Sequence, residues 1–197
     1  MLEYIAEQIR AQAFASLSWI SRPAGLVEML QVRNGNNFTK FPAAKPYYGV
    51  VCEPGDYLNM SPDGKEACIA FVDSAGDLKI EQRTSHFERF SAYFRVVVWY
   101  DEKRITVGGV MSKTAAMAFE IQNEVKQVNF DAPKLSGCKV LSEGITENPA
   151  NIWGSYGFKP DDQLFMLPYR TFAVSFRLRG FLFGKCEDFS VQAQEVC

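Results

Sequence analysis

The sequence predicts a single α+β domain in which two helices cover a mostly antiparallel, twisted sheet. Residues 87–100 and 170–183 predict two long strands, because apolar and polar side chains alternate along both with a period of two. Residues 2–20 and 112–127 predict two amphipathic helices, because their apolar side chains recur every three or four positions. With 47% hydrophobic and 14% aromatic residues in 197, the chain can form a core of its own.

The first helix is expected to be followed by a β-hairpin. Its buried stripe consists of five apolar side chains, Leu2, Ile5, Ile9, Ala13 and Leu17. Arg22-Pro23 is expected to end the helix, because proline disfavours helical geometry at the residue before it. Residues 26–33 and 38–41 then form the hairpin around Asn34-Gly35, a dipeptide suited to a two-residue turn, and Pro42 breaks the second strand.

Three more short strands are predicted before the first long one, at residues 47–52, 67–72 and 78–83. Residues 53–66 contain three turn dipeptides and are expected to form a loop that is mobile or contacts partners. Residues 73–77 are expected to join the last two short strands as a hairpin loop, with Gly76 at a positive φ angle. The domain is expected to span residues 1–184, followed by a polar tail at residues 185–197.

The two long strands are expected to pair with each other. Val97 and Trp99 make the otherwise polar face of the first one apolar, so its far end is expected to be covered on both faces. Ser112 is the expected N-cap of the second helix. The buried stripe of that helix is Thr114, Ala118, Ile121, Val125 and Val128. Residues 138–143 are predicted to form a short strand before the last long one.

The sequence contains no motif of catalysis or cofactor binding. Its five cysteines are widely spaced and its one histidine is His86, so neither a zinc site nor a disulfide framework is indicated. Residues 108–114 lack the glycine that precedes the lysine of a phosphate-binding loop, and the paired carboxylates lie in turns or the tail. We expect no cofactor, no metal and no enzymatic activity, while a Cys–His pair assembled in space stays open.

Five arginines on or beside the long strands are candidate channel or subunit-contact residues: Arg89, Arg95, Arg170, Arg177 and Arg179. If the strands are adjacent, these side chains form a cationic stripe that suits a phosphate backbone or a neighbouring subunit's carboxylates. The alternative is an ordinary solvated sheet face that also carries acids. The net charge of −2 argues against the strongly basic surface of a dedicated nucleic-acid-binding protein.

The cysteine pattern predicts free thiols in a reducing compartment. Glu3 and Glu7 stand where a signal peptide would have basic residues, and no stretch approaches the about 20 apolar residues that a membrane helix needs. We therefore expect a soluble protein that folds in the cytoplasm, without membrane contact.

The order of elements resembles that of bacteriophage tail-terminator (tail-completion) proteins and their neck relatives. The resemblance rests on Leu2–Ile20, on His86–Tyr100 followed by Ser112–Gln127, and on Gly154–Asp162 leading into Tyr169–Phe183. Relative to that family, residues 38–66 are an extension, and no site residue transfers. The resemblance implies a structural virion protein, made in the host's bacterial cytoplasm, that forms a ring, typically a hexamer. Such a ring caps the tail tube and meets the head connector. In a ring of this kind the arginine stripe could face the channel and have transient contact with passing DNA.

The sequence is therefore compatible with two functions. The first is virion assembly, with other copies of the chain, tail-tube protein and head-connector protein as partners. The alternative is a small-molecule-binding or regulatory α+β domain of a bacterial cell, without catalytic activity. Its expected aromatic pocket consists of Tyr47, Tyr48, Trp153 and Tyr156.

Overall fold

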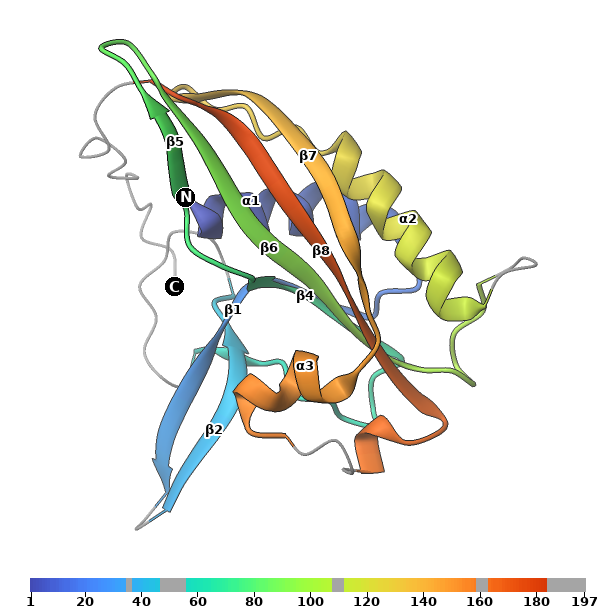
Figure 1. The fold of residues 1–197 in the computed structure, drawn as a ribbon. Coiled ribbons are helices and arrows are strands. Elements are labelled where there is room, and N and C mark those ends of the chain that lie inside the picture. Colours follow the sequence, from blue (N-terminus) through green and yellow to red (C-terminus); the bar gives the residue numbers. More distant parts are fainter. Residues whose placement is uncertain (35–36, 47–55, 108–111, 159–162, 184–197) are drawn as a thin grey trace.

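Two strands of 14 residues each lie at the centre of the sheet. β6 (Glu88–Asp101) and β8 (Tyr169–Leu182) pair in antiparallel register over their whole length, which confirms the predicted pairing. The computed structural model, drawn in Figure 1, describes residues 1–34, 37–46, 56–107, 112–158 and 163–183. The strand predicted at 47–52 and the tail predicted at 185–197 lie outside the described residues.

The described strands form one mixed sheet in the order β3-β2-β1-β4-β6-β8-β7, with β5 also paired to β6. The other strands are β1 (Arg22–Asn34), β2 (Asn37–Ala44), β3 (Leu58–Asn59), β4 (Cys68–Ser74), β5 (Lys79–Arg83) and β7 (Leu135–Thr146). Within the described part of the chain β1 and β4 are the parallel pair, and the other pairs are antiparallel. The predicted α+β class with a mostly antiparallel sheet is confirmed.

Three helical segments pack on one face of the sheet: α1 (Leu2–Gln8), the π-helix η1 (Ile9–Phe14) and α2 (Lys113–Gln127) (Figure 1). Both predicted stripes face the core, and nine of their ten residues are buried, Leu2 being half-buried. Ser112 caps α2 as predicted, since its hydroxyl accepts a hydrogen bond from the backbone N–H of Ala115 at 3.2 Å. The first helix ends near Ser16 and not at residue 20, because the chain turns early to bring Ser21 beside Cys68 of β4.

The opposite face is covered over part of its area by α3 (Pro149–Trp153) and the 3₁₀ helices η2 (Gly154–Tyr156) and η3 (Gln163–Phe165). Trp153 and Trp99 are fully buried in an apolar cluster between these helices and the sheet, separate from the core under α1 and α2. Val97 is also fully buried, so the predicted covering of the far end of β6 on both faces is confirmed.

The hairpin predicted at residues 73–77 is wrong. β4 pairs with the second half of β6, from Ser74 opposite Phe94 to Cys68 opposite Tyr100. β5 pairs with the first half of the same strand. The two short strands therefore lie one after the other along β6, which is long enough to pair with both, and Gly76 does not have a positive φ angle.

Two strands are longer than predicted. β2 continues through Pro42, which contributes only its carbonyl to pairing and accepts a hydrogen bond from the N–H of Met60 at 2.8 Å. β7 spans 12 residues. It was predicted too short because bulges after Ser136 and after Ser142 interrupt the alternation of side chains that indicates a strand.

β1 and β2 project from the body of the sheet as a two-stranded arm (Figure 1). β1 pairs with β4 between Arg22 and Leu26, and from Val27 to Asn34 its partner is β2. We call residues 27–34 and 37–44 the β-arm. Asn34 pairs with Asn37, so the hairpin connects through residues 35–36, one position later than predicted; these two residues lie outside the described part of the chain.

Candidate partner surface on the open half of the sheet

The second face of β6 and β8 consists of a covered half and an open half. Cross-strand pairing places Val97, Trp99, Thr171 and Ala173 on this face under α3, and all four are buried. Toward the other end of both strands, no described helix covers the same face. We define the open half by ten side chains: Lys79, Glu81, Arg89, Tyr93, Lys139, Leu141, Glu143, Arg177, Arg179 and Phe181.

Three of the five predicted arginines meet on the open half. In the register of β6 and β8, no arginine lies directly opposite another arginine. Arg89 pairs with Phe181, Arg177 pairs with Tyr93, and Arg179 pairs with Ser91. Each of the three also lies near a carboxylate. The distance from Nε is 2.9 Å between Arg177 and Glu143, 3.4 Å between Arg89 and Glu81, and 3.5 Å between Arg179 and Glu81.

Two lysines that were not predicted from the sequence belong to the same surface. Lys139 lies directly opposite Arg179 on β7. The Lys79 ammonium lies 5.6 Å from the centre of the Tyr93 ring, and the Arg177 guanidinium lies 6.0 Å from it, so one aromatic ring contacts two cations. The pairing registers of β5 and β7 place these two lysines on the open half. The sequences of the two strands do not define those registers, so the lysines could not be predicted from sequence.

A cavity of about 250 Å³ opens on this surface, lined by Arg89, Gly137, Lys139, Leu141, Arg179, Gly180 and Phe181. Its backbone wall depends on two glycines. Gly137 has a φ angle of +62° at the β7 bulge, a conformation that favours glycine. Gly180 has no room for a side chain, because a Cβ atom there would lie 2.9 Å from the Phe90 ring and 3.0 Å from the Cys138 sulfur.

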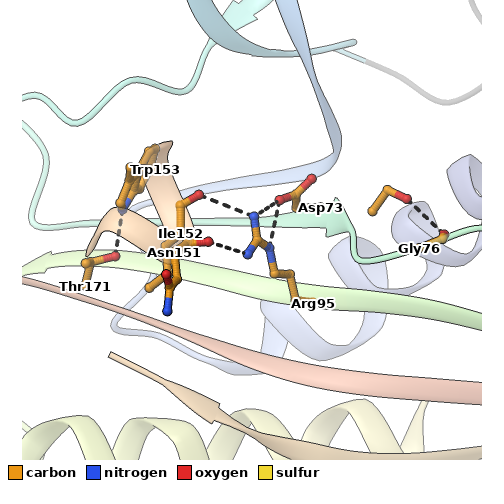
Figure 2. A network of polar contacts seen from close by, with 8 residues as sticks. Asp73, Gly76, Arg95, Asn151, Ile152, Trp153 and Thr171 are labelled. Atoms are coloured by element: carbon orange, nitrogen blue, oxygen red, sulfur yellow. Dashed lines mark hydrogen bonds and ion pairs between the residues drawn. The ribbon is translucent and has the colours of Figure 1, made fainter. Parts of the chain in front are cut away.

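Arg95 lies on the same face but within the covered half, where it holds α3 against the sheet. Figure 2 shows its guanidinium donating to Asp73 Oδ2 at 2.6 and 2.8 Å and to the carbonyls of Asn151 and Ile152 at 2.9 and 3.3 Å. Beside it, Trp153 Nε1 donates to the Thr171 hydroxyl at 2.8 Å. All of these polar groups are satisfied within the fold, so Arg95 acts as a structural residue.

Arg170 lies on the other face of the sheet. It is paired with Tyr100, whose side chain belongs to the core under the long helices, and its Nε donates to Glu102 at 3.0 Å. The five predicted arginines therefore do not form one stripe: three share the open half, one is in the covered half and one is on the opposite face.

The open half is positive relative to the rest of the molecule. It contains the cations Lys79, Arg89, Lys139, Arg177 and Arg179 and the carboxylates of Glu81 and Glu143, a net charge of +3. Since the whole chain has a net charge of −2, all residues outside the open half together have a net charge of −5. Such an uneven distribution favours contact with acidic groups.

Among the described residues, neither Cys68 nor Cys138 forms a hydrogen bond with His86. His86 precedes β6, while Cys68 pairs with Tyr100 at the far end of that strand, about 40 Å away at about 3.3 Å per residue. Burial raises the pKa of the Cys138 thiol to about 11, which leaves little of the reactive thiolate at neutral pH. Cys52, Cys186 and Cys197 lie outside this part of the chain, within which no cluster of metal-ligating side chains occurs.

Among the described helices, none is long and apolar enough to cross a membrane. The chain was compared with protein-family models, with curated proteins and with solved structures, and nothing matched it.

Proposed function

We propose that this chain is a structural protein of virion assembly. In this proposal its copies form a ring at the head-proximal end of a phage tail, where the ring terminates the tail tube and joins it to the head connector. The phage context comes from the resemblance in element order between residues 2–20, 86–127 and 154–183 and the tail-terminator family. Two features of the fold support a role in assembly.

The β-arm is the observation that carries the proposal. A two-stranded ribbon beyond the edge of a sheet has no core of its own and is marginally stable in water. Its base is packed, since Val27 and Ala44 are buried, but Glu28, Met29 and Gln31 are exposed further along. An exposed arm of this kind suits a partner that covers it, and the simplest partner is the next copy in a ring.

The open half supports the same proposal. Its arginines lie 2.9 to 3.5 Å from carboxylates of the same chain, and its net charge is modest. A DNA-binding surface usually has many uncompensated cations, whereas alternating charges suit a protein partner. We therefore assign this surface to contact with a neighbouring subunit or tail protein, and DNA in the ring's channel would make only passing contact.

The alternative of a small-molecule-binding domain is less well supported. Tyr47 and Tyr48 lie outside the described residues. Trp153 packs against Phe71 with ring centroids 5.6 Å apart, and Tyr156 packs against Trp153 at 6.0 Å. Both rings are thus part of a packed core rather than the wall of a pocket.

The first prediction concerns assembly through the arm. Purified protein at high concentration, alone and mixed with tail-tube protein, is expected to form rings that light scattering and negative-stain images detect. Met29→Lys is expected to weaken association at least about tenfold, because it adds a charge to an apolar contact; Met29 is 42% exposed, so folding is unaffected.

Phe119→Lys is the matched control, because it makes the same kind of change at a side chain that is 56% exposed on α2, away from the arm. A strict monomer under all of these conditions, or equal effects of the two substitutions, would contradict the proposal.

A further inference from the structure

We propose that the cavity on the open half binds the acidic segment Glu187-Asp188-Phe189 of this same chain, supplied by the same copy or by a neighbouring one. The segment lies beyond the described residues, and its sequence combines two carboxylates with an aromatic ring. The inference names an occupant for the surface used in the proposed function. It does not depend on that function, because the segment can bind without a ring.

The first reason is that cations outnumber carboxylates at the cavity. Arg89, Lys139 and Arg179 surround the cavity, and one carboxylate, Glu81, lies near two of them. Its oxygens are 3.4 and 3.5 Å from the two Nε atoms, longer than the about 2.7 to 2.9 Å of a charge-assisted hydrogen bond. The Arg179 Nε is buried, but the side chain as a whole is 36% exposed, so its terminal guanidinium nitrogens are the atoms that a ligand carboxylate would reach. The site therefore has room for further carboxylate oxygens.

The second reason is an apolar wall beside the cations. Leu141 lines the cavity and is 42% exposed. Phe181, also in the lining, meets Phe87 edge to face with ring centroids 5.3 Å apart, and Phe183 beyond it is 43% exposed. Edge-to-face clusters readily accept another aromatic ring. The fitting ligand is consequently a peptide with carboxylates next to an aromatic side chain.

The third reason is that the chain supplies such a peptide at the right place. β8 ends at Leu182, one residue after Phe181 of the cavity wall. Glu187 to Phe189 follow within seven residues, which span at most about 25 Å when extended. Residues 184–197 contain one other acid, Glu195, and one aromatic residue, Phe189, so the matching chemistry is confined to this segment.

A peptide-binding experiment tests the inference. A fluorescent peptide of residues 184–197 is added to the 197-residue protein in which Glu187→Lys and Asp188→Lys remove the competing acidic segment, and fluorescence anisotropy is measured. We expect saturable binding that weakens at least about tenfold when Lys139→Glu is added, because this reverses a cation in the cavity. Lys126→Glu, on an exposed position of α2, is the control and leaves binding unchanged.

Charge reversal in the peptide completes the test. A peptide with both acids changed to lysine is expected to lose binding to the Lys139 protein and to regain it with Lys139→Glu, as a double-mutant cycle requires for a direct contact. Equal binding of the normal and reversed peptides, or no effect of Lys139→Glu, would overturn the inference.

Cross-linking locates the segment in the intact chain. In Leu141→Cys protein, mild oxidation is expected to join residue 141 to Cys186, next to the acidic pair, whereas Lys126→Cys gives no such product in peptide maps. A cross-linked monomer means binding within one chain, and a cross-linked dimer means exchange between copies; absence of the product counts against the inference.

Failure of this inference and failure of the proposed function can be told apart. If the peptide binds while the protein stays monomeric in light scattering, the inference holds and ring assembly fails. If rings form and cavity variants disrupt them without any peptide binding, another surface of the neighbouring copy occupies the cavity, and the inference is wrong.

Discussion

Arginines on one face of one strand have different roles in this protein. Arg95 and Arg89 share the same parity on β6, six residues apart. The first is enclosed by Asp73 and the carbonyls of α3, with a side-chain exposure of 20%, while the second is 44% exposed at the cavity. The two arginines differ in exposure because α3 covers the end of β6 at Arg95, whereas no described helix covers the end at Arg89. The alternation of β6 predicted the shared face but contained no information about α3, a helix of five residues.

The second prediction tests the structural role of Arg95. Arg95→Met is expected to lower the free energy of unfolding by about 3 kcal/mol, because Asp73 and two carbonyls lose their donor in a site with little water. Arg89→Met is the matched control and should cost less than about 1 kcal/mol, as for exposed ion pairs. Urea unfolding followed by tryptophan fluorescence measures both. Equal losses would show that Arg95 is not an anchor for α3.

At the scale of elements, long and strictly periodic segments were predictable and short or irregular ones were not. β6, β8 and α2 match their predicted bounds within one or two residues, because burial on one face imposes a simple period. The hairpin between β4 and β5 was predicted wrongly because neighbours in sequence were expected to pair, whereas both strands pair with β6. β7 was predicted too short because Gly137 and Gly144 lie in bulges, where two residues oppose one.

The third prediction concerns the close packing of β7, β8 and β6 behind the cavity. Gly180→Ala is expected to destabilise the protein by about 2 kcal/mol, because its Cβ atom would lie 2.9 Å from the Phe90 ring in a packed core. Gly154→Ala is the matched control. A Cβ atom there meets no atom within 4 Å, so this change should be neutral or slightly stabilising. Thermal unfolding compares the two, and a neutral Gly180→Ala would contradict the packing described.

At the scale of the molecule, the sheet has one face under helices and a second face that is only half covered. The open half has a net charge of +3 on a chain whose total is −2, and the β-arm extends beyond the same sheet. The sequence predicted three residues of this surface, Arg89, Arg177 and Arg179, because they share strand parity. Arg170 has the opposite parity and belongs to the other face. The positions of Lys79 and Lys139 depend on pairing registers that only the fold defines.

The last prediction separates the two surfaces by their response to salt. If the open half contributes to assembly, raising NaCl from 0.1 M to 1 M is expected to weaken association at least about tenfold, because the Debye length falls from about 10 Å to about 3 Å. Arg89→Gln with Lys139→Gln removes two cations without adding repulsion, so this variant should associate more weakly at 0.1 M and respond less to salt. Met29→Lys, at an exposed apolar side chain of the β-arm, should lower association while the response to salt persists. Sedimentation velocity across the salt series measures all three proteins. Association that is unchanged or stronger in 1 M NaCl would assign assembly to the β-arm alone and remove the open half from the subunit contact.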